Sequence, residues 1–198
     1  MKIQYYYGIP SPFAYLGSTR LQAISKKYNL EVIEKPCDLV GGIFVKTGGI
    51  PVPQRSPQRQ KYRLDEIKRW SKFLNIKINI NPKFFPPKDP HLPAKFTIAA
   101  NLLGVKVVFG HELLKQLWSE EKDISDEKNL EAVSNNFTIN FKELSELAKS
   151  EKVSKIYSDN TDEAIKQNVF GSPSYIFNNE LFWGQDRLEF LERALKNA

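Results

Sequence analysis

The first 36 residues constrain the fold most, because they read as a strand, a helix and a second strand. Residues 3–7 are β-branched or aromatic except for Gln4, residues 12–28 place apolar side chains at helical spacing, and residues 30–36 again favour a strand. Two strands joined through a helix of this size are parallel, with the right-handed crossover that nearly all such units adopt. We therefore expect an α/β fold that begins with a β-α-β unit.

A turn with a serine at its end joins the first strand to the helix. Ser11-Pro12 is a typical helix start, since serine is a preferred N-cap and proline is favoured at the first helical position. On their own these two residues predict nothing more. The first turn of a helix nevertheless has unpaired backbone N–H groups and the positive end of the helix dipole, so an anion held beside Ser11 would be stabilised.

A second segment rich in turn signals lies near the C-terminus. Phe170-Gly171-Ser172-Pro173 leads into a strand at 175–177, and a tight hairpin leads to a strand at 181–183 and a closing helix. Only about 5% of X-Pro bonds are cis, so the local sequence predicts a trans bond before Pro173. Asp186, followed by Glu189, predicts a capping-box start for the last helix.

The middle of the chain has helical patterns throughout. They follow a Gly/Pro-rich stretch at 41–57 and cover residues 57–75, 93–103, 108–121, 127–135 and 140–150. A strand is expected at 153–157 and a helix at 161–168. We therefore predict that residues 1–40 and 152–198 form one domain, into which residues 41–151 are inserted as a helical domain.

Composition and the single cysteine narrow the function classes. With 198 residues, of which 41% are hydrophobic, the chain can bury a real core, and its apolar stretches are shorter than the roughly 20 residues that a membrane span needs. Cys37 has no partner for an internal disulfide or a Cys-X-X-Cys redox pair, and we expect a buried, inert thiol. With no signal peptide visible, a cytoplasmic location is expected.

The net charge of +6 raises the question of nucleic acid. The basic residues at 55–72 alternate with apolar ones at helical spacing, which predicts the solvated face of an amphipathic helix rather than a nucleic-acid groove. His91 and His111 lie in no motif, so surface or packing roles are expected and no metal site is predicted.

In combination and order, these motifs resemble the 2-hydroxychromene-2-carboxylate isomerases and the kappa-class glutathione transferases. Both are serine-bearing relatives of the DsbA-like branch of the thioredoxin superfamily. The matching segments are 11–16, 38–39, 69–70, 169–173 and 183–188, so the resemblance spans nearly the whole chain. It implies a thioredoxin-like fold with a large all-helical insertion, and a cis bond at Ser172–Pro173 that faces the helix start at Ser11.

The resemblance also implies glutathione as the cofactor. Ser11 would donate a hydrogen bond to the thiol sulfur, and the backbone of Ser172, next to Pro173, would pair with the cysteinyl residue, so that the Ser172 side chain would matter little. The γ-glutamyl end would be held by the turn Trp183, Gly184, Gln185 and Asp186. The implied activity is a glutathione-dependent isomerase of aromatic catabolism, acting by thiolate addition, bond rotation and elimination.

The residues expected to contact the substrate depart from the family pattern. Candidate partners for an aromatic carboxylate are Lys46, Gln54, Arg55 and Phe84. Where the isomerases carry a lysine this chain has Ile43, their Asn-Arg pair appears as Gln54-Arg55 displaced by one residue, and a tyrosine is replaced by Phe84. Two alternatives therefore stay open: a kappa-like transferase or peroxidase acting on another electrophile, and a non-catalytic thiol- or peptide-binding protein. A homodimer is compatible with the resemblance.

Overall fold

The N-terminal unit folds as the sequence predicts. In the computed structural model, which describes residues 1–198, β1 (Lys2–Tyr7), α1 (Pro12–Lys27) and β2 (Glu31–Pro36) follow one another, and β1 and β2 pair in parallel from Lys2 opposite Glu31 to Tyr7 opposite Pro36. Alternate residues of β1 face opposite ways, as in any strand. Gln4 and Tyr6 point towards one helical layer, where both donate hydrogen bonds to Glu163.

The last residues complete a four-stranded sheet in the order β2-β1-β3-β4. β3 (Ser174–Phe177) lies antiparallel to β1, and β4 (Glu180–Trp183) forms a hairpin with β3. Asn178 and Asn179 in the hairpin turn both have positive φ, which is what a two-residue turn with the twist of the strands requires. A short helical turn η3 (Gln185–Arg187) then leads into α9 (Leu188–Lys196).

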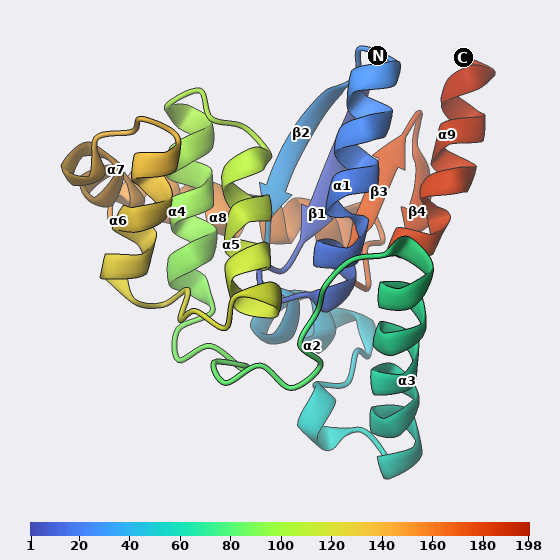
Figure 1. Cartoon of the computed structure of the whole chain (residues 1–198). Helices are drawn as coiled ribbons and strands as arrows, with labels where there is room; N and C mark the ends of the chain where they lie inside the picture. The colour runs from blue at the N-terminus through green and yellow to red at the C-terminus, as the bar shows by residue number, and fades with distance from the viewer.

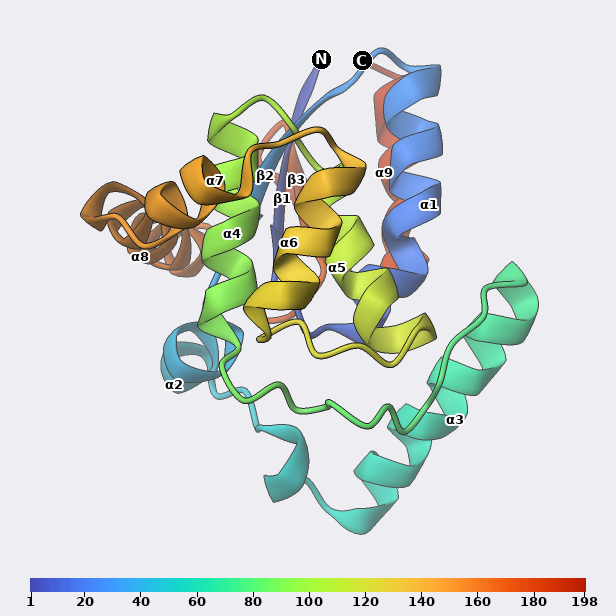
Figure 2. The same cartoon turned by 60° about the vertical axis from the view of Figure 1, so that its left-hand side comes forward.

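Helices cover the sheet and extend beyond it (Figure 1). Between β2 and β3 the chain forms η1 (Leu39–Ile43), α2 (Phe44–Thr47), η2 (Val52–Gln54), α3 (Pro57–Leu74), α4 (His91–Leu102), α5 (Val108–Ser119), α6 (Glu127–Asn136), α7 (Phe141–Ala148) and α8 (Glu151–Lys166). Seen along the sheet edge, α1 and α9 lie on one face and α8 on the other (Figure 2). One hydrophobic cluster runs from β1 through α4 and α5 to α6, so the domain boundaries at 40/41 and 151/152 stay a prediction. None of the helices has both the length and the apolar character to cross a membrane.

The prediction for residues 153–168 is wrong. The expected strand at 153–157 lies in the single helix α8. The expected helix at 161–168 lies in the same helix, except for residues 167 and 168. Ser150 starts this helix, since its Oγ accepts a hydrogen bond from the N–H of Val153 at 3.2 Å. The buried residues of α8 recur at helical spacing and are Val153, Asn160, Thr161 and Ala164. The β-branched and aromatic residues at 153–157 suggested a strand, but five residues are too short a window to show the helical spacing.

Stacked tyrosines form the centre of the core on the α1 side of the sheet. The ring of Tyr5 stacks on Tyr7, with centroids 4.3 Å apart, and on Tyr175 at 5.3 Å. The Tyr7 hydroxyl donates to the buried carboxyl of Glu34, whose other oxygen accepts from the N–H of Val107 at 2.9 Å. Burial raises the pKa of Glu34, while the hydrogen bonds from Tyr7 and Val107 act in the opposite direction.

Val107 is a β-branched residue at φ +65°, a conformation that such residues rarely adopt. The N–H of Val108 donates to the carbonyl of Lys106 at 2.7 Å across it, which is the hydrogen bond of a three-residue γ-turn. Helix α5 begins at Val108, and at Gly110 it lies close to side chains of β1 and β2. A side chain at Gly110 would collide with the Tyr7 hydroxyl and with the Glu34 carboxyl.

Cys37 is buried at 3% exposure, as predicted. Burial raises the pKa of its thiol to about 12, so it stays protonated and unreactive near neutral pH.

His111 makes stability depend on pH. It is buried, with Nδ1 2.8 Å from the Gln22 side-chain nitrogen, and desolvation lowers its pKa from 6.5 to about 3. A depressed pKa contributes stability that is present above pH 6.5 and is lost as the pH falls towards 3. We expect His111→Gln to flatten this loss in urea unfolding at stepped pH, and the exposed His91→Gln to leave it unchanged. Equal slopes in both variants would contradict the assignment.

Candidate functional site

Ser11 is the N-cap of α1 and lies almost buried, at 8% exposure. Its Oγ accepts a hydrogen bond from the N–H of Ala14 at 3.2 Å, and its own N–H donates to the carbonyl of Gly8 at 2.9 Å. The first turn of α1 contains no acidic side chain. The positive end of the helix dipole is therefore not neutralised locally and favours an anion at this position.

The Ser172–Pro173 turn lies against Ser11, and its peptide bond is cis, as the resemblance implied. The Ser11 hydroxyl donates to the carbonyl of Ser172 at 3.4 Å, and the N–H of Gly8 donates to the Ser172 Oγ at 3.1 Å. The Ser172 side chain therefore contacts the turn before Ser11, and the expectation that it matters little for binding glutathione stays a prediction. The contact between Gly8 and Ser172 fixes this turn. It joins two segments that are far apart in the sequence, and no local sequence pattern indicates it.

The turn after β4 joins the same cluster. The N–H of Gly184 donates to the carbonyl of Pro173 at 2.8 Å, and Gly184 has φ +107°, which L side chains rarely adopt. Trp183 is half exposed and packs edge-on against Phe170, with ring centroids 4.6 Å apart. The structure thus brings together four of the predicted residues, Ser11, Ser172, Pro173 and Gly184, and Trp183 lies next to them in the chain.

Gln185 and Asp186 differ in their surroundings. Gln185 is buried, and both its backbone carbonyl and its Oε1 accept hydrogen bonds from Arg20, at 3.1 and 3.2 Å. Arg20 was missed as a site residue, although a charge within the apolar stripe of α1 was a signal for it. Asp186 pairs with Arg187 at 2.9 Å and caps no helix, so the capping-box prediction is wrong. The helical turn η3 separates Asp186 from the start of α9.

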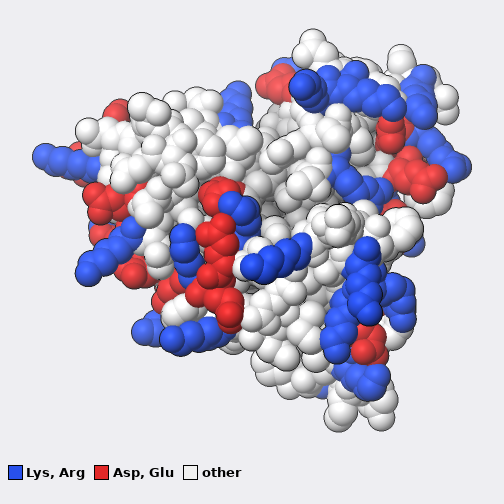
Figure 3. Space-filling view, in the orientation of Figure 1, with Lys and Arg blue, Asp and Glu red and all other residues white.

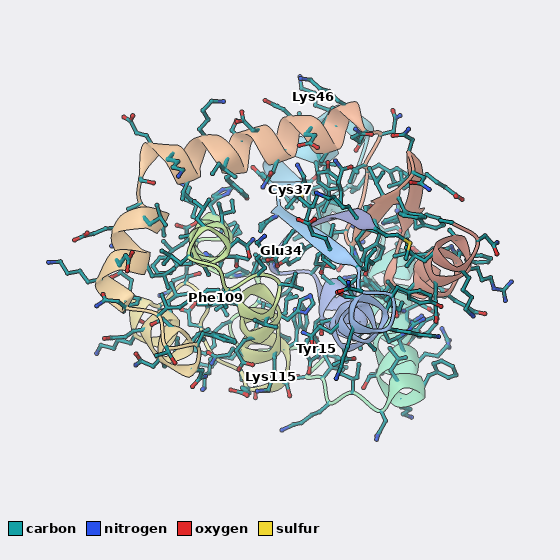
Figure 4. All side chains as sticks on the ribbon, turned by 90° about the horizontal axis from the view of Figure 1, so that it is seen from above. Tyr15, Glu34, Cys37, Lys46, Phe109 and Lys115 are labelled. Carbon is teal, nitrogen blue, oxygen red and sulfur yellow. The ribbon has the colours of Figure 1, made fainter.

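The four predicted substrate residues lie in the helical insertion. Lys46 is exposed on α2 at the edge of the molecule (Figure 4), and Gln54 is exposed at the end of η2. Arg55 is half-buried and donates from Nε to the carbonyl of Ile50 at 2.8 Å. Phe84 is half-buried beneath the ammonium of Lys83. Phe84 also packs against the main hydrophobic cluster, and the role of all four residues in binding a substrate stays a prediction.

Ile43 stands where the isomerases carry a lysine. It is fully buried beside Tyr6 and Cys37, so a side chain at position 43 faces the core of this protein and not a ligand. The nearest lysine, Lys46, starts from the outer side of α2.

Comparison with known proteins decides the family. A family model described as a DSBA-like thioredoxin domain matches residues 2–196. The chain belongs to the DsbA-like thioredoxin family. The fold prediction for this DsbA-like protein, thioredoxin-like with a mostly helical insertion, is confirmed.

Relatives of this DsbA-like protein carry two names. It is 22% identical over 193 residues to the 2-hydroxychromene-2-carboxylate isomerase of Sphingobium xenophagum, which covers 98% of this chain and 97% of the relative. It is 23% identical over 205 residues to glutathione S-transferase kappa 1 of Rattus norvegicus, which covers 98% and 90%. A solved structure of a 2-hydroxychromene-2-carboxylate isomerase matches with a TM-score of 0.82 at 22% identity and covers 100% of this chain and 95% of that one.

Chemically, the site of the DsbA-like protein offers one hydroxyl donor at a helix start and no thiol of its own. Cys37, the only cysteine, is buried. Disulfide exchange through a pair of thiols within one chain is therefore excluded.

Proposed function

We propose that the protein is a glutathione-dependent isomerase that converts 2-hydroxychromene-2-carboxylate to trans-o-hydroxybenzylidenepyruvate. The observation that supports this most is the Ser11 hydroxyl, which lies at the start of α1 against the carbonyl of Ser172. A relative named for this reaction aligns over nearly its whole length, which supports the same chemistry.

Glutathione is an extended peptide, and the turns around Ser11 suit one. Its cysteinyl residue pairs with the backbone of Ser172, as an added strand pairs with a sheet edge. Its γ-glutamyl carboxylate meets the backbone amides of Gln185 and Asp186, and its ammonium meets the Asp186 carboxylate. The hydrogen bonds from Arg20 to Gln185 hold this turn in place. The half-exposed ring of Trp183 covers the apolar part of the ligand.

Ser11 activates the thiol by hydrogen bonding and not as a nucleophile. A free thiol has a pKa of about 8.5, so most of it is protonated at neutral pH. The Ser11 hydroxyl hydrogen makes only a long bond, 3.4 Å, to the Ser172 carbonyl, and it turns readily to a sulfur anion. A donor to the anion and the dipole of α1 both favour the thiolate.

The reaction then proceeds without any oxidant or reductant. The thiolate sulfur forms a bond to the conjugated ring carbon, the double bond shifts to give an enol, and the ring C–O bond breaks with its electron pair on the phenolic oxygen. The carbon–carbon bond that is now single rotates. The enol loses its proton, and the phenolic oxygen takes up one proton in exchange. The carbonyl and the trans double bond form as the C–S bond breaks and the thiolate leaves. Glutathione is regenerated, so the net change is an isomerisation.

The experiment follows 2-hydroxychromene-2-carboxylate by absorbance with purified protein, with and without glutathione, while free thiol is titrated. Conversion to the trans isomer that depends on glutathione but leaves the thiol concentration unchanged would support the proposal. Thiol consumption would instead favour a kappa-like transferase. The burial of Ile43 and the exposure of Lys46 favour that second candidate, because they leave the electrophile side unlike that of the isomerases. No conversion under either condition would overturn the proposed substrate.

A further inference from the structure

Arg63, in the middle of α3, is a half-buried cation with no anionic partner. Lys and Arg gather on the surface over α3 (Figure 3). The acidic residues of this helix pair with others: Asp65 with Lys61, and Glu66 with Arg69. Arg63 instead places its guanidinium over the ring of Phe85, 5.5 Å from the centroid. Burial and the nearby charge of Arg55 lower the pKa of Arg63 to about 10.

The guanidinium lines a hollow of about 260 Å³. The walls come from α3, from the turn before it and from the segment after it: Val52, Gln60, Arg63, Leu64, Ile80, Asn81, Pro82 and Phe85. Half of these residues are hydrophobic, among them the aromatic Phe85. The polar groups are one cation and two side-chain amides, and no carboxylate is among them.

The hollow lies on the side of the molecule where α1 begins. The segment between α3 and α4 is tied to α1 by the Tyr15 hydroxyl, which donates to the carbonyl of Lys77 at 2.9 Å. In Figures 1 and 2 this segment passes beneath the start of α1, which is the end that carries Ser11. A ligand in the hollow is thus on the insertion side of the thiol site.

We propose that this hollow binds a small aromatic carboxylate, with Arg63 holding the carboxylate and Phe85 and Leu64 contacting the ring. The planar guanidinium can form two parallel hydrogen bonds to a carboxylate, which a lysine in the same place cannot. Binding also removes the cost of a half-buried charge without a counterion. The amide of Asn81 supplies a further donor at the rim. Sequence patterns predicted most basic residues of α3 to be solvated, and Arg63 is the exception.

The size of the hollow limits the ligand. Sites for drug-sized molecules are about 300–1,000 Å³, so a hollow of about 260 Å³ takes an acid with one or two rings. The identification of the natural ligand as the electrophile of the thiol reaction rests on the proposed function. The proposal that the hollow binds an aromatic acid does not rest on that function.

The test uses cinnamate, an aromatic acid, and its neutral analogue cinnamyl alcohol, titrated by calorimetry into the full chain without glutathione. We expect cinnamate to bind and the alcohol to bind at least about tenfold more weakly, because charge-assisted hydrogen bonds are lost. Arg63→Gln should weaken cinnamate binding by a similar factor, and Arg63→Lys should recover only part of it. The matched control is Arg59→Gln, which removes the same charge from an exposed position one turn earlier.

Three outcomes would overturn the inference: no cinnamate binding by the parent protein, equal binding of the alcohol, or equal weakening by Arg59→Gln and Arg63→Gln. Thermal unfolding of each variant checks that it is folded, and Arg63→Lys serves if Arg63→Gln is not. Ser11→Ala should leave cinnamate binding unchanged. If the chromene is not isomerised while cinnamate binding depends on Arg63, the proposed function fails and the acid site stands. If the chromene is isomerised and Arg63→Gln changes neither the KM for the chromene nor the binding of cinnamate, the acid site fails and the proposed function stands.

Discussion

Ser11→Ala is expected to lower kcat/KM for the glutathione-dependent reaction by about 100-fold or more, the effect of removing one donor to a reacting anion. The pH profile should change with it. In the parent protein we expect the acid limb to report a thiol pKa that Ser11 and the dipole of α1 lower. In the variant this limb should move up towards about 8.5, the pKa of a free thiol. The measurement is kcat/KM across the pH range at saturating glutathione.

Ser18→Ala is the matched control for this prediction. Ser18 is a buried serine of the same helix, and its hydroxyl donates to the carbonyl of Tyr15 at 2.8 Å. Both substitutions remove one hydroxyl from α1, and Ser11→Ala also costs about 1 kcal/mol of stability through the lost N-cap. Unfolding curves separate that cost from the kinetic effect. An unchanged pH profile in Ser11→Ala would mean that another group activates the thiol.

The largest effect on stability is expected for Gly110→Ala. A methyl group at Gly110 in α5 would overlap the fully buried Tyr7 hydroxyl and the Glu34 carboxyl that accepts a hydrogen bond from it. Alanine favours a helix over glycine by about 1 kcal/mol, but crowding in a packed core costs about 1–3 kcal/mol. Here the methyl group meets two polar groups bonded to each other, so we expect a net loss of about 2 kcal/mol in the free energy of unfolding.

A double variant tests the cause. Tyr7→Phe removes the hydroxyl that the new methyl group meets first, so Gly110→Ala should cost less in a Tyr7→Phe background than in the parent protein. Urea unfolding of the four proteins in this cycle gives the coupling energy. Additive effects would show that the overlap at the Tyr7 hydroxyl is not what destabilises the variant.

The regular parts of the fold could be predicted from the sequence because their periodicity is local. The strands and helix of the first 36 residues, the hairpin and most helices of the insertion lie where the spacing of apolar residues indicated. The error at 153–168 arose where five residues resemble a strand within a longer helical pattern. A window that extended to Ala164 would have shown the helical spacing.

The site could be predicted only in part, because its contacts join distant segments. The preference of a local X-Pro bond pointed to trans before Pro173, and only the family resemblance indicated cis. The hydrogen bond from Gly8 to Ser172 has no local signature. The charge of Arg20 within the apolar stripe of α1 was a signal, but it did not identify Gln185 as the partner. Arg63 looked like its solvated neighbours on α3, since the sequence gives no sign that Phe85 lies over it.

The Ser11–Ser172 contact has a consequence for folding and for ligand screening. The two residues are 161 positions apart, so the proposed thiol site forms only when the first and last parts of the sheet have paired. A chain that has lost this pairing has no site left, and a ligand that binds there stabilises only the native state. At 100 times its Kd such a ligand adds about 2.7 kcal/mol. The shift in melting temperature across a panel of thiols would therefore rank the natural cofactor candidates before any substrate is known.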